Sequence, residues 1–272
     1  MVKVNAGRPH RRFYYRKNNW ELFPFTRGFV GRRRFRRFKD RFSLLEIRSI
    51  LVAWLVLAVA FGYVLYPILF STGFVYVFGA AAIVLGLGFI FHELMHKFAA
   101  QRYGYDAEFR VWPFWLVFAL IMAFAVGVVF AAPGATYFQP DPREYYMDPK
   151  GFTKRYGIIS LAGPEINIVF GAAFLGLFYL AKSFINVATA STPGLFALLV
   201  FSLGAYINFY LAAFNMIPFG NMGSISLDGY KVWRWNRVYW ALFFAVPVVI
   251  TALIFLGYIP VVSQLVPILS RI

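Results

Sequence analysis

The sequence predicts an all-α polytopic membrane protein with about five to six transmembrane helices. Of its 272 residues 61% are hydrophobic, and the mean hydropathy is +0.65. The chain contains several apolar runs long enough to cross a bilayer, and its Lys and Arg residues lie mainly outside these runs. Ordinary soluble domains do not have this composition. The chain has no cysteine, so disulfides and thiolate metal ligands are excluded.

Residues 1–48 form a basic tail that precedes an expected membrane domain, residues 49–272. The tail holds 15 of the 27 Lys and Arg residues, including the run Arg32-Arg33-Arg34. The positive-inside rule therefore predicts a multi-pass protein of the cell membrane with a cytoplasmic N-terminus. Anionic lipid headgroups are the partner expected for this tail. Aromatic residues between the arginines would also suit nucleic acid, which is the less favoured alternative.

Five apolar runs predict crossings of the membrane, at 49–70, 74–100, 156–181, 194–217 and 240–259. A sixth run, 111–132, is also about long enough to cross. If it did, the four basic residues of the 133–155 loop would lie outside, against the positive-inside rule. Pro113 and Pro133-Gly134 bracket this run, so we expect it to enter the membrane and return, with an extended piece over 126–138. This scheme leaves 25 of the 27 basic residues on the cytoplasmic side.

A His-Glu-x-x-His motif, His92-Glu93-Leu94-Met95-His96, lies near the cytoplasmic end of the second predicted crossing. Residues at i and i+4 share one face of a helix, which suits two ligands of one tetrahedral zinc ion. A Glu beside the first His can act as general base on a water molecule at the metal. A solvated polar cluster at a helix end is the alternative. Ionisable residues at membrane depth are costly and usually functional, which favours one zinc ion per chain.

The third zinc ligand is expected to be a carboxylate. The remaining histidine, His10, lies in the tail, and only two later acids have a plausible membrane depth. Asp228 follows the fourth crossing on the cytoplasmic side, and Glu165 lies two or three turns into the third crossing. Both acids are therefore candidates for the third ligand, with Glu165 as the alternative to Asp228.

Three motifs in this order resemble the site-2 protease family of intramembrane zinc metalloproteases. They are His92-Glu93-x-x-His96, Gly163-Pro164-x-x-Asn167, and Asn215-x-x-Pro218 followed by Leu227-Asp228-Gly229. The resemblance implies zinc binding by His92, His96 and Asp228, with Glu93 as catalytic base. It also implies that Asn215 contributes to catalysis at the substrate or oxyanion. Substrate-binding residues are expected at Pro133, Gly134 and Asn167.

The resemblance implies hydrolysis of a peptide bond within or near a transmembrane helix of a membrane-anchored protein. A scaffold member that binds zinc without cleaving is the main alternative, although an intact Glu93 argues against it. A transporter with an ion site at Glu165 and a helix broken at Pro164 is a further alternative. The chain departs from the family pattern in four respects: the gap from Asn215 to Asp228 is longer than usual, the proline usual just before the Asp is missing, Tyr230 stands where a second glycine is common, and Glu165 occupies a position that is generally apolar.

Overall fold

The computed structural model describes residues 42–66, 72–140, 142–222 and 225–261, so most of the basic tail lies outside the described residues. Five described helices are long and apolar enough to cross a membrane: α1 Leu44–Leu65, α2 Thr72–Arg102, α5 Pro149–Phe184, α6 Thr192–Asn215 and α8 Arg237–Phe255. The predicted class, a polytopic and mainly helical membrane protein, is therefore confirmed.

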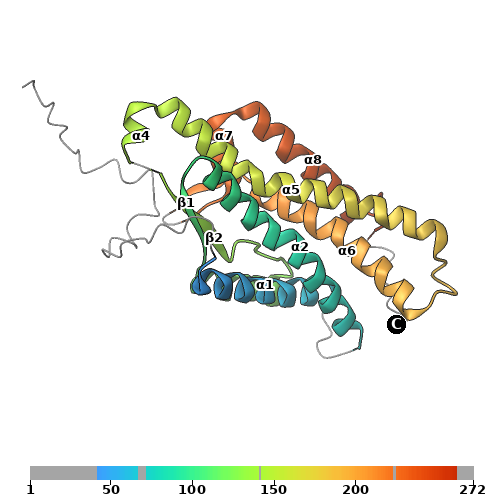
Figure 1. Ribbon diagram of the computed structural model, residues 1–272. Helices are drawn as coiled ribbons and strands as arrows, with labels where there is room; N and C mark the ends of the chain where they lie inside the picture. The colour runs from blue at the N-terminus through green and yellow to red at the C-terminus, as the bar shows by residue number, and fades with distance from the viewer. Residues whose placement is uncertain (1–41, 67–71, 141, 223–224, 262–272) are drawn as a thin grey trace, which may run out of the picture.

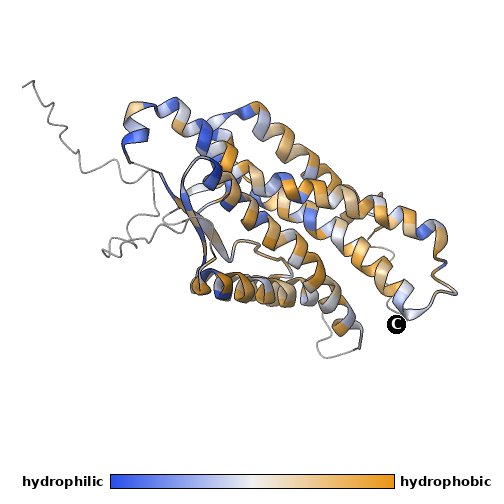
Figure 2. Ribbon diagram, in the orientation of Figure 1, coloured by the Kyte–Doolittle hydropathy of each residue, from blue (hydrophilic) through white to orange (hydrophobic). Residues whose placement is uncertain are grey.

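The membrane-length helices form one packed group, in which α1 lies on the far side of α2 from α5 (Figure 1). Helices α2, α5 and α6 contact one another, α8 lies against α6, and α1 packs on α2. The interior between them is apolar, with Leu199, Leu203 and Phe209 almost completely buried. Apolar residues also cover the outer faces of these helices (Figure 2). A helix that is hydrophobic on all sides is typical of a membrane span.

The run after α2 is re-entrant. It consists of β1 Asp106–Val111, α3 Pro113–Ile121, a π-helical turn η3 Met122–Val126, and β2 Gly134–Gln139. The strands pair antiparallel, from Asp106 opposite Gln139 to Val111 opposite Gly134. The two ends of the segment therefore meet, which confirms the re-entrant prediction. The extended piece expected over 126–138 is wrong in its bounds, because residues 128–133 are irregular and only β2 finds a partner strand.

Helix α5 begins earlier than the sequence suggested and does not break. After the short helix α4, Pro142–Met147, the side chain of Asp148 accepts a hydrogen bond from Gly151 N and caps α5. The helix then continues through Pro164, so the broken helix expected for a transporter is absent from this described segment. A proline inside a helix removes one hydrogen bond and crowds the preceding turn, but neighbouring helices can support the backbone around it.

The longer gap between Asn215 and Asp228 contains two short strands. They are β3 Gly220–Met222 and β4 Ile225–Ser226, which pair antiparallel. The next helix, α7 Asp228–Trp235, starts directly at the predicted ligand and leads into α8. The additional residues therefore form a small excursion, and the chain still returns to α7 next to the end of α6.

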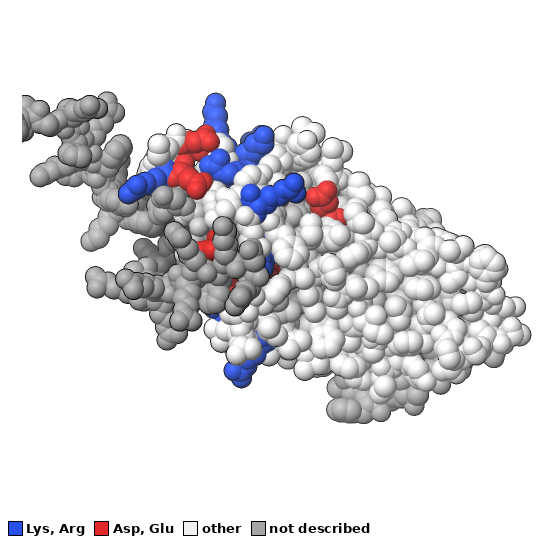
Figure 3. Space-filling view, viewed as in Figure 1, with Lys and Arg blue, Asp and Glu red and all other residues white. Residues whose placement is uncertain are grey.

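Charged residues gather at one end of the molecule. In Figure 3 most of the blue and red atoms lie near α4, α7 and the start of α5, a further blue group lies lower at the same end, and the opposite end is white. The residues that follow α2 and those that follow α6 both belong to this end. The apolar body and the charged end match the division between hydrocarbon and the membrane surface.

Candidate metal centre

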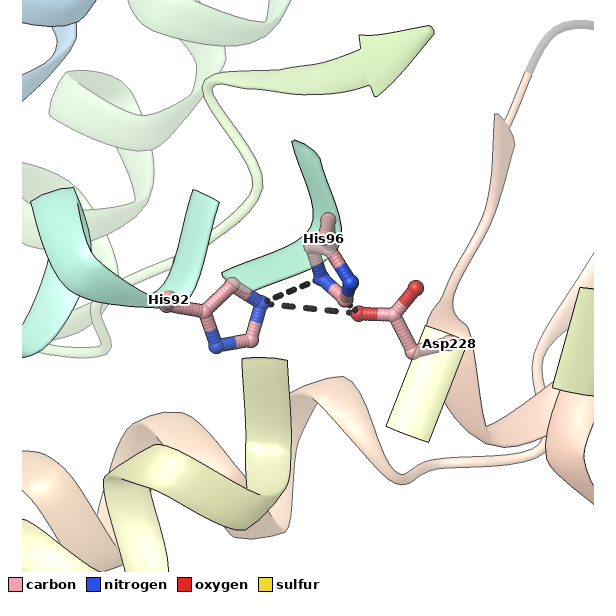
Figure 4. Close-up of side chains that lie close together, drawn as sticks. All are labelled: His92, His96 and Asp228. Carbon is pink, nitrogen blue, oxygen red and sulfur yellow. Dashed lines mark hydrogen bonds and ion pairs between the residues drawn. The ribbon is translucent and has the colours of Figure 1, made fainter. Parts of the chain in front are cut away.

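Helix α2 places two histidine rings side by side in the interior. His92 and His96 are one helical turn apart and only 4% and 6% exposed. Their Nε2 atoms lie 3.0 Å apart, with the ring planes at 85°. Figure 4 shows both rings directed toward the start of α7.

Asp228, the first residue of α7, completes a group of three ligand-type side chains. Its Oδ2 atom lies 3.5 Å from His92 Nε2 and 3.0 Å from His96 Nε2 (Figure 4). Tetrahedral zinc with bonds of about 2.0–2.2 Å keeps its ligand atoms about 3.3–3.6 Å apart. Two imidazole nitrogens and one carboxylate oxygen are also ligands that zinc accepts. The His92–Asp228 separation lies in this range and the other two, both 3.0 Å, are slightly shorter, so small movements of the rings would let the three side chains hold a zinc ion.

The outer nitrogens of both rings have hydrogen-bond acceptors that fix the tautomer. His92 Nδ1 lies 2.5 Å from Asn167 Oδ1, and His96 Nδ1 lies 2.8 Å from the carbonyl oxygen of Ile159. Because these carbonyl oxygens accept a hydrogen bond from Nδ1–H, the proton of each neutral ring is on Nδ1, and the lone pair of Nε2 points to the group of three. Such outer partners raise the basicity of a metal-binding histidine and hold its ring in place.

Asn167, which the sequence analysis expects to bind substrate, lies in the interior of the protein beside His92. Asn167 is completely buried, and its Nδ2 donates to the carbonyl of Gly88 and to Oδ1 of Asn208. Its Oδ1 accepts from His92, so all of these contacts are internal. Asn167 lies behind the histidine and positions it.

Close approach of α5 to the rings depends on glycine at one position. A Cβ atom at Gly163 would lie 2.4 Å from His96 Nε2 and 2.7 Å from His92 Nε2. Real Cβ contacts of this length essentially do not occur, so a side chain at this position would push the rings apart. The Gly163-Pro164 pair of the second motif therefore has a steric reason.

The carboxylate of Asp228 has a second contact that turns it toward the histidines. Its Oδ1 atom lies 3.2 Å from Lys231 Nζ, one turn along α7, so that Oδ2 is left for the rings. Burial by itself raises the pKa of the Asp228 carboxyl, but His96 and Lys231 outweigh it and hold this pKa well below its usual range. At the next residue, Gly229, a Cβ would lie 2.0 Å from the carbonyl oxygen of Met216. Only glycine allows α7 to start this close to the end of α6.

Glu93 lies in the same pocket as the three ligands. Its side chain is 8% exposed, and its Oε2 accepts a hydrogen bond of 2.7 Å from Thr136 Oγ1 on β2. The pocket has a volume of about 50 Å³, which is enough for a few water molecules. A carboxylate beside a small wet space has the position that a general base requires.

The other residues singled out from the sequence fall into two groups. Gly134 and Asn215 line the pocket, and Pro133 immediately precedes β2, where its carbonyl accepts from Trp112 N. Glu165 is exposed on α5 and is not part of the metal-ligating group. It lies two residues from Gly163 and from Asn167, which places it on the opposite face of the helix. Of the two candidate acids, Asp228 is the one that the structure brings to the histidines.

Comparison with known proteins gives one informative relative. Over 202 residues the chain is 36% identical to a protein of Methanocaldococcus jannaschii named "Putative zinc metalloprotease". The match covers 74% of this chain and 90% of the relative. The chain belongs to this family of zinc metalloproteases. No family model and no solved structure matches the chain.

Two polar residues of this zinc metalloprotease were missed by the sequence reasoning, Thr136 and Lys231. Thr136 reaches Glu93 through a strand pairing that no sequence pattern indicates. Lys231 had a detectable signal, because a Lys three residues after an Asp in a helix lies on the same face as that Asp. In the sequence analysis this lysine counts only as one of the basic residues expected on the cytoplasmic side.

Proposed function

We propose that this chain is a zinc metalloendopeptidase of the site-2 protease type, which cuts a peptide bond within or near a transmembrane helix of a membrane-anchored protein. The observation that carries the proposal is the convergence of His92, His96 and Asp228 next to Glu93 at the end of a membrane-length helix. From His96 to the end of α2 at Arg102 is six residues, or about 9 Å. The reaction therefore takes place just below the membrane surface.

Each polar residue of the pocket has a role in this reaction. Zinc, when bound by His92, His96 and Asp228, supplies Lewis acidity for water activation and carbonyl polarisation. Glu93 takes the proton from the attacking water and passes it to the leaving nitrogen. Asn215 Nδ2 donates one hydrogen to the carbonyl of Leu211 at 3.0 Å. An amide has two such hydrogens, so the second is available for the developing oxyanion.

The substrate meets the pocket at the start of β2. A helical substrate hides its amides in its own hydrogen bonds, so it has to unwind before cleavage. Strand β2 pairs with β1 along one edge, and no strand of the described residues pairs with its other edge. Gly134 at the beginning of β2 lines the pocket, so an unwound substrate can add to this edge as a further strand.

The proposed orientation puts the charged end and the pocket in the cytoplasm, with the protein in the cell membrane and the basic tail on anionic lipid headgroups. Arg143 and Lys150 then face the cytoplasm. Single cysteines at these two positions of the cysteine-free chain would be protected from an impermeant thiol reagent in sealed right-side-out vesicles. A cysteine at Lys182, at the other end of α5, is the matched control and should react. Labelling of the cysteines at 143 and 150 from outside would show that the protein has the opposite orientation in the membrane.

The decisive experiment on activity is Glu93→Gln. The amide keeps the shape of the carboxylate but cannot accept the proton, so we expect normal zinc content and a loss of at least about 100-fold in cleavage of a membrane-embedded reporter helix. A wild-type protein that holds one zinc per chain and cleaves no reporter would favour the scaffold alternative. Full turnover by Glu93→Gln would mean that another residue is the base.

A further inference from the structure

A pair of opposite charges is buried beside the metal-ligating motif. Glu46, in the first turn of α1, is 1% exposed, and Lys97, which directly follows His96, is 2% exposed. Lys97 Nζ lies 2.5 Å from Glu46 Oε2, and it also lies 4.0 Å from the centre of the Phe42 ring. Buried charges are costly even when they are paired, so such a pair in a membrane protein usually has a role beyond stability.

Glu46 connects three elements rather than two. Its Oε1 atom accepts a hydrogen bond of 3.1 Å from Phe109 N, on the outer edge of β1. Ser43 holds the start of α1 by accepting from Glu46 N at 3.0 Å, and its hydroxyl also donates to Glu108 of β1. One carboxylate therefore ties α1 to α2 through Lys97 and to β1 through Phe109.

The connection continues across the strand pair to the catalytic base. Phe109 of β1 stands opposite Thr136 of β2 in the register. Thr136 Oγ1 is the hydroxyl that donates to Glu93 Oε2 at 2.7 Å, and it also lies 3.3 Å from the Glu93 carbonyl oxygen. Glu93 and Lys97 are one turn apart on α2. The series of contacts that begins at Lys97 on α2 therefore ends at Glu93 on the same helix.

We propose that this closed circuit, formed by Lys97, Glu46, Phe109, Thr136 and Glu93, holds the β1–β2 hairpin against α2 and thereby positions the carboxylate of Glu93. Glu46 and Lys97 are positioning residues, which act on the base through the hairpin. The circuit contains none of the three proposed zinc ligands. Its loss is therefore expected to affect turnover and the geometry of the hairpin, and to leave the zinc content unchanged. The catalytic part of this inference rests on the proposed peptidase function.

The test combines two variants that interrupt the circuit at separate points. Glu46→Met with Lys97→Met removes both charges together, so that neither remains buried and unpaired. Thr136→Val removes the hydroxyl but keeps the shape of the side chain. Each should lower kcat on a membrane-embedded reporter helix by about 10- to 100-fold, because small displacements of a catalytic group have effects of this size. KM and zinc content should stay at wild-type values.

The critical result is whether the kcat losses of Glu46→Met/Lys97→Met and of Thr136→Val are independent when the two variants are combined. If both act through Glu93, the combined variant should be no slower than the slower of the two, and Thr136→Ser should restore kcat. Tyr210→Phe is the matched control, since it removes a partly buried hydroxyl on α6 that donates at 2.6 Å to the carbonyl oxygen of Val129, which lies in the same re-entrant segment but outside the circuit. Multiplying losses in the combined variant, or an equal loss in Tyr210→Phe, would overturn the proposal.

A second measurement does not depend on activity. Phe98 on α2 and Gln139 at the end of β2 are both exposed, so spin labels on cysteines at these positions report the distance between helix and hairpin. The distance distribution should broaden in Glu46→Met/Lys97→Met and remain unchanged in Tyr210→Phe. An unchanged distribution in the charge-free variant would refute the circuit even if the wild type cleaves nothing. A broadened distribution without any wild-type cleavage would instead locate the failure in the proposed function.

Discussion

The two sides of the metal-ligating group are built in different ways. On one side, His92 and His96 lie in the packed interface of α2 and α5, where Asn167 and the carbonyl of Ile159 hold their rings. On the other side, Asp228 begins a short helix after an irregular stretch with two small strands, and its outer contact is the partly exposed Lys231. The helical side is thus arranged by the fold of the membrane domain. The carboxylate side depends on local contacts. We therefore expect the loss of zinc affinity on substitution to be largest at the ligand Asp228, smaller at the buried partner Asn167, and smallest at the partly exposed partner Lys231.

The largest effect is expected for Asp228→Ala, which removes a ligand from the less rigid side. Zinc affinity should fall by more than the roughly 10- to 100-fold loss that is typical for an outer partner. Glu165→Ala is the matched control, since this acid lies on the opposite face of α5, and it should keep wild-type affinity. Zinc titration against a chelator of known affinity measures both. A greater loss in Glu165→Ala would reverse the assignment of the third ligand.

An intermediate effect is expected for Asn167→Leu, which keeps the volume but removes the acceptor for His92 Nδ1. The ring is then free to rotate, so zinc affinity should fall by about 10- to 100-fold. Asn208→Leu tests the specificity of this result, because Asn208 contacts Asn167 and not the histidine. We expect a smaller loss of affinity for Asn208→Leu. Equal losses would indicate that the polar interior as a whole, and not the bond to His92, determines affinity.

The smallest effect is expected for Lys231→Met, which removes the outer contact of Asp228. The lysine is partly exposed, and ion pairs with solvent contact contribute little, so zinc affinity should fall by no more than about tenfold. Lys231→Arg should restore the wild-type value in the same chelator titration. If Lys231→Met lost as much affinity as Asn167→Leu, the two sides of the group would be equally dependent on their outer partners.

The same contrast explains how far the sequence could predict the structure. The membrane helices and the histidine pair depend on composition and on helical spacing, and both can be counted along the chain. The re-entrant segment followed from the distribution of Arg and Lys together with flanking prolines. Helix bounds were less well predicted, because α5 gains its first turn from the cap at Asp148 and from Pro149.

What the sequence did not reveal are contacts that arise only when distant segments pack. The buried position of Asn167 behind His92 depends on how α5 rotates against α2, and the second motif alone does not fix that rotation. Thr136 reaches Glu93 because β1 and β2 pair in one particular register. Glu46 and Lys97 are 51 positions apart, and neither has a neighbour in sequence that indicates an ion pair.

The pairing of Val111 with Gly134 also has a consequence for how the chain can change in length. The two ends of the segment between these residues lie next to each other. Residues can therefore be added to it or removed from it without changing the direction in which any later helix crosses the membrane. The left-handed Gly127, with φ of 73° at the end of η3, is a natural point for such an insertion. The number of crossings between the histidines and Asp228, at present the two helices α5 and α6, has to stay even. A single additional span would carry Asp228 to the other face of the membrane, about 30 Å away from the histidines. The wall of the pocket can therefore vary in size while the metal ligands stay together.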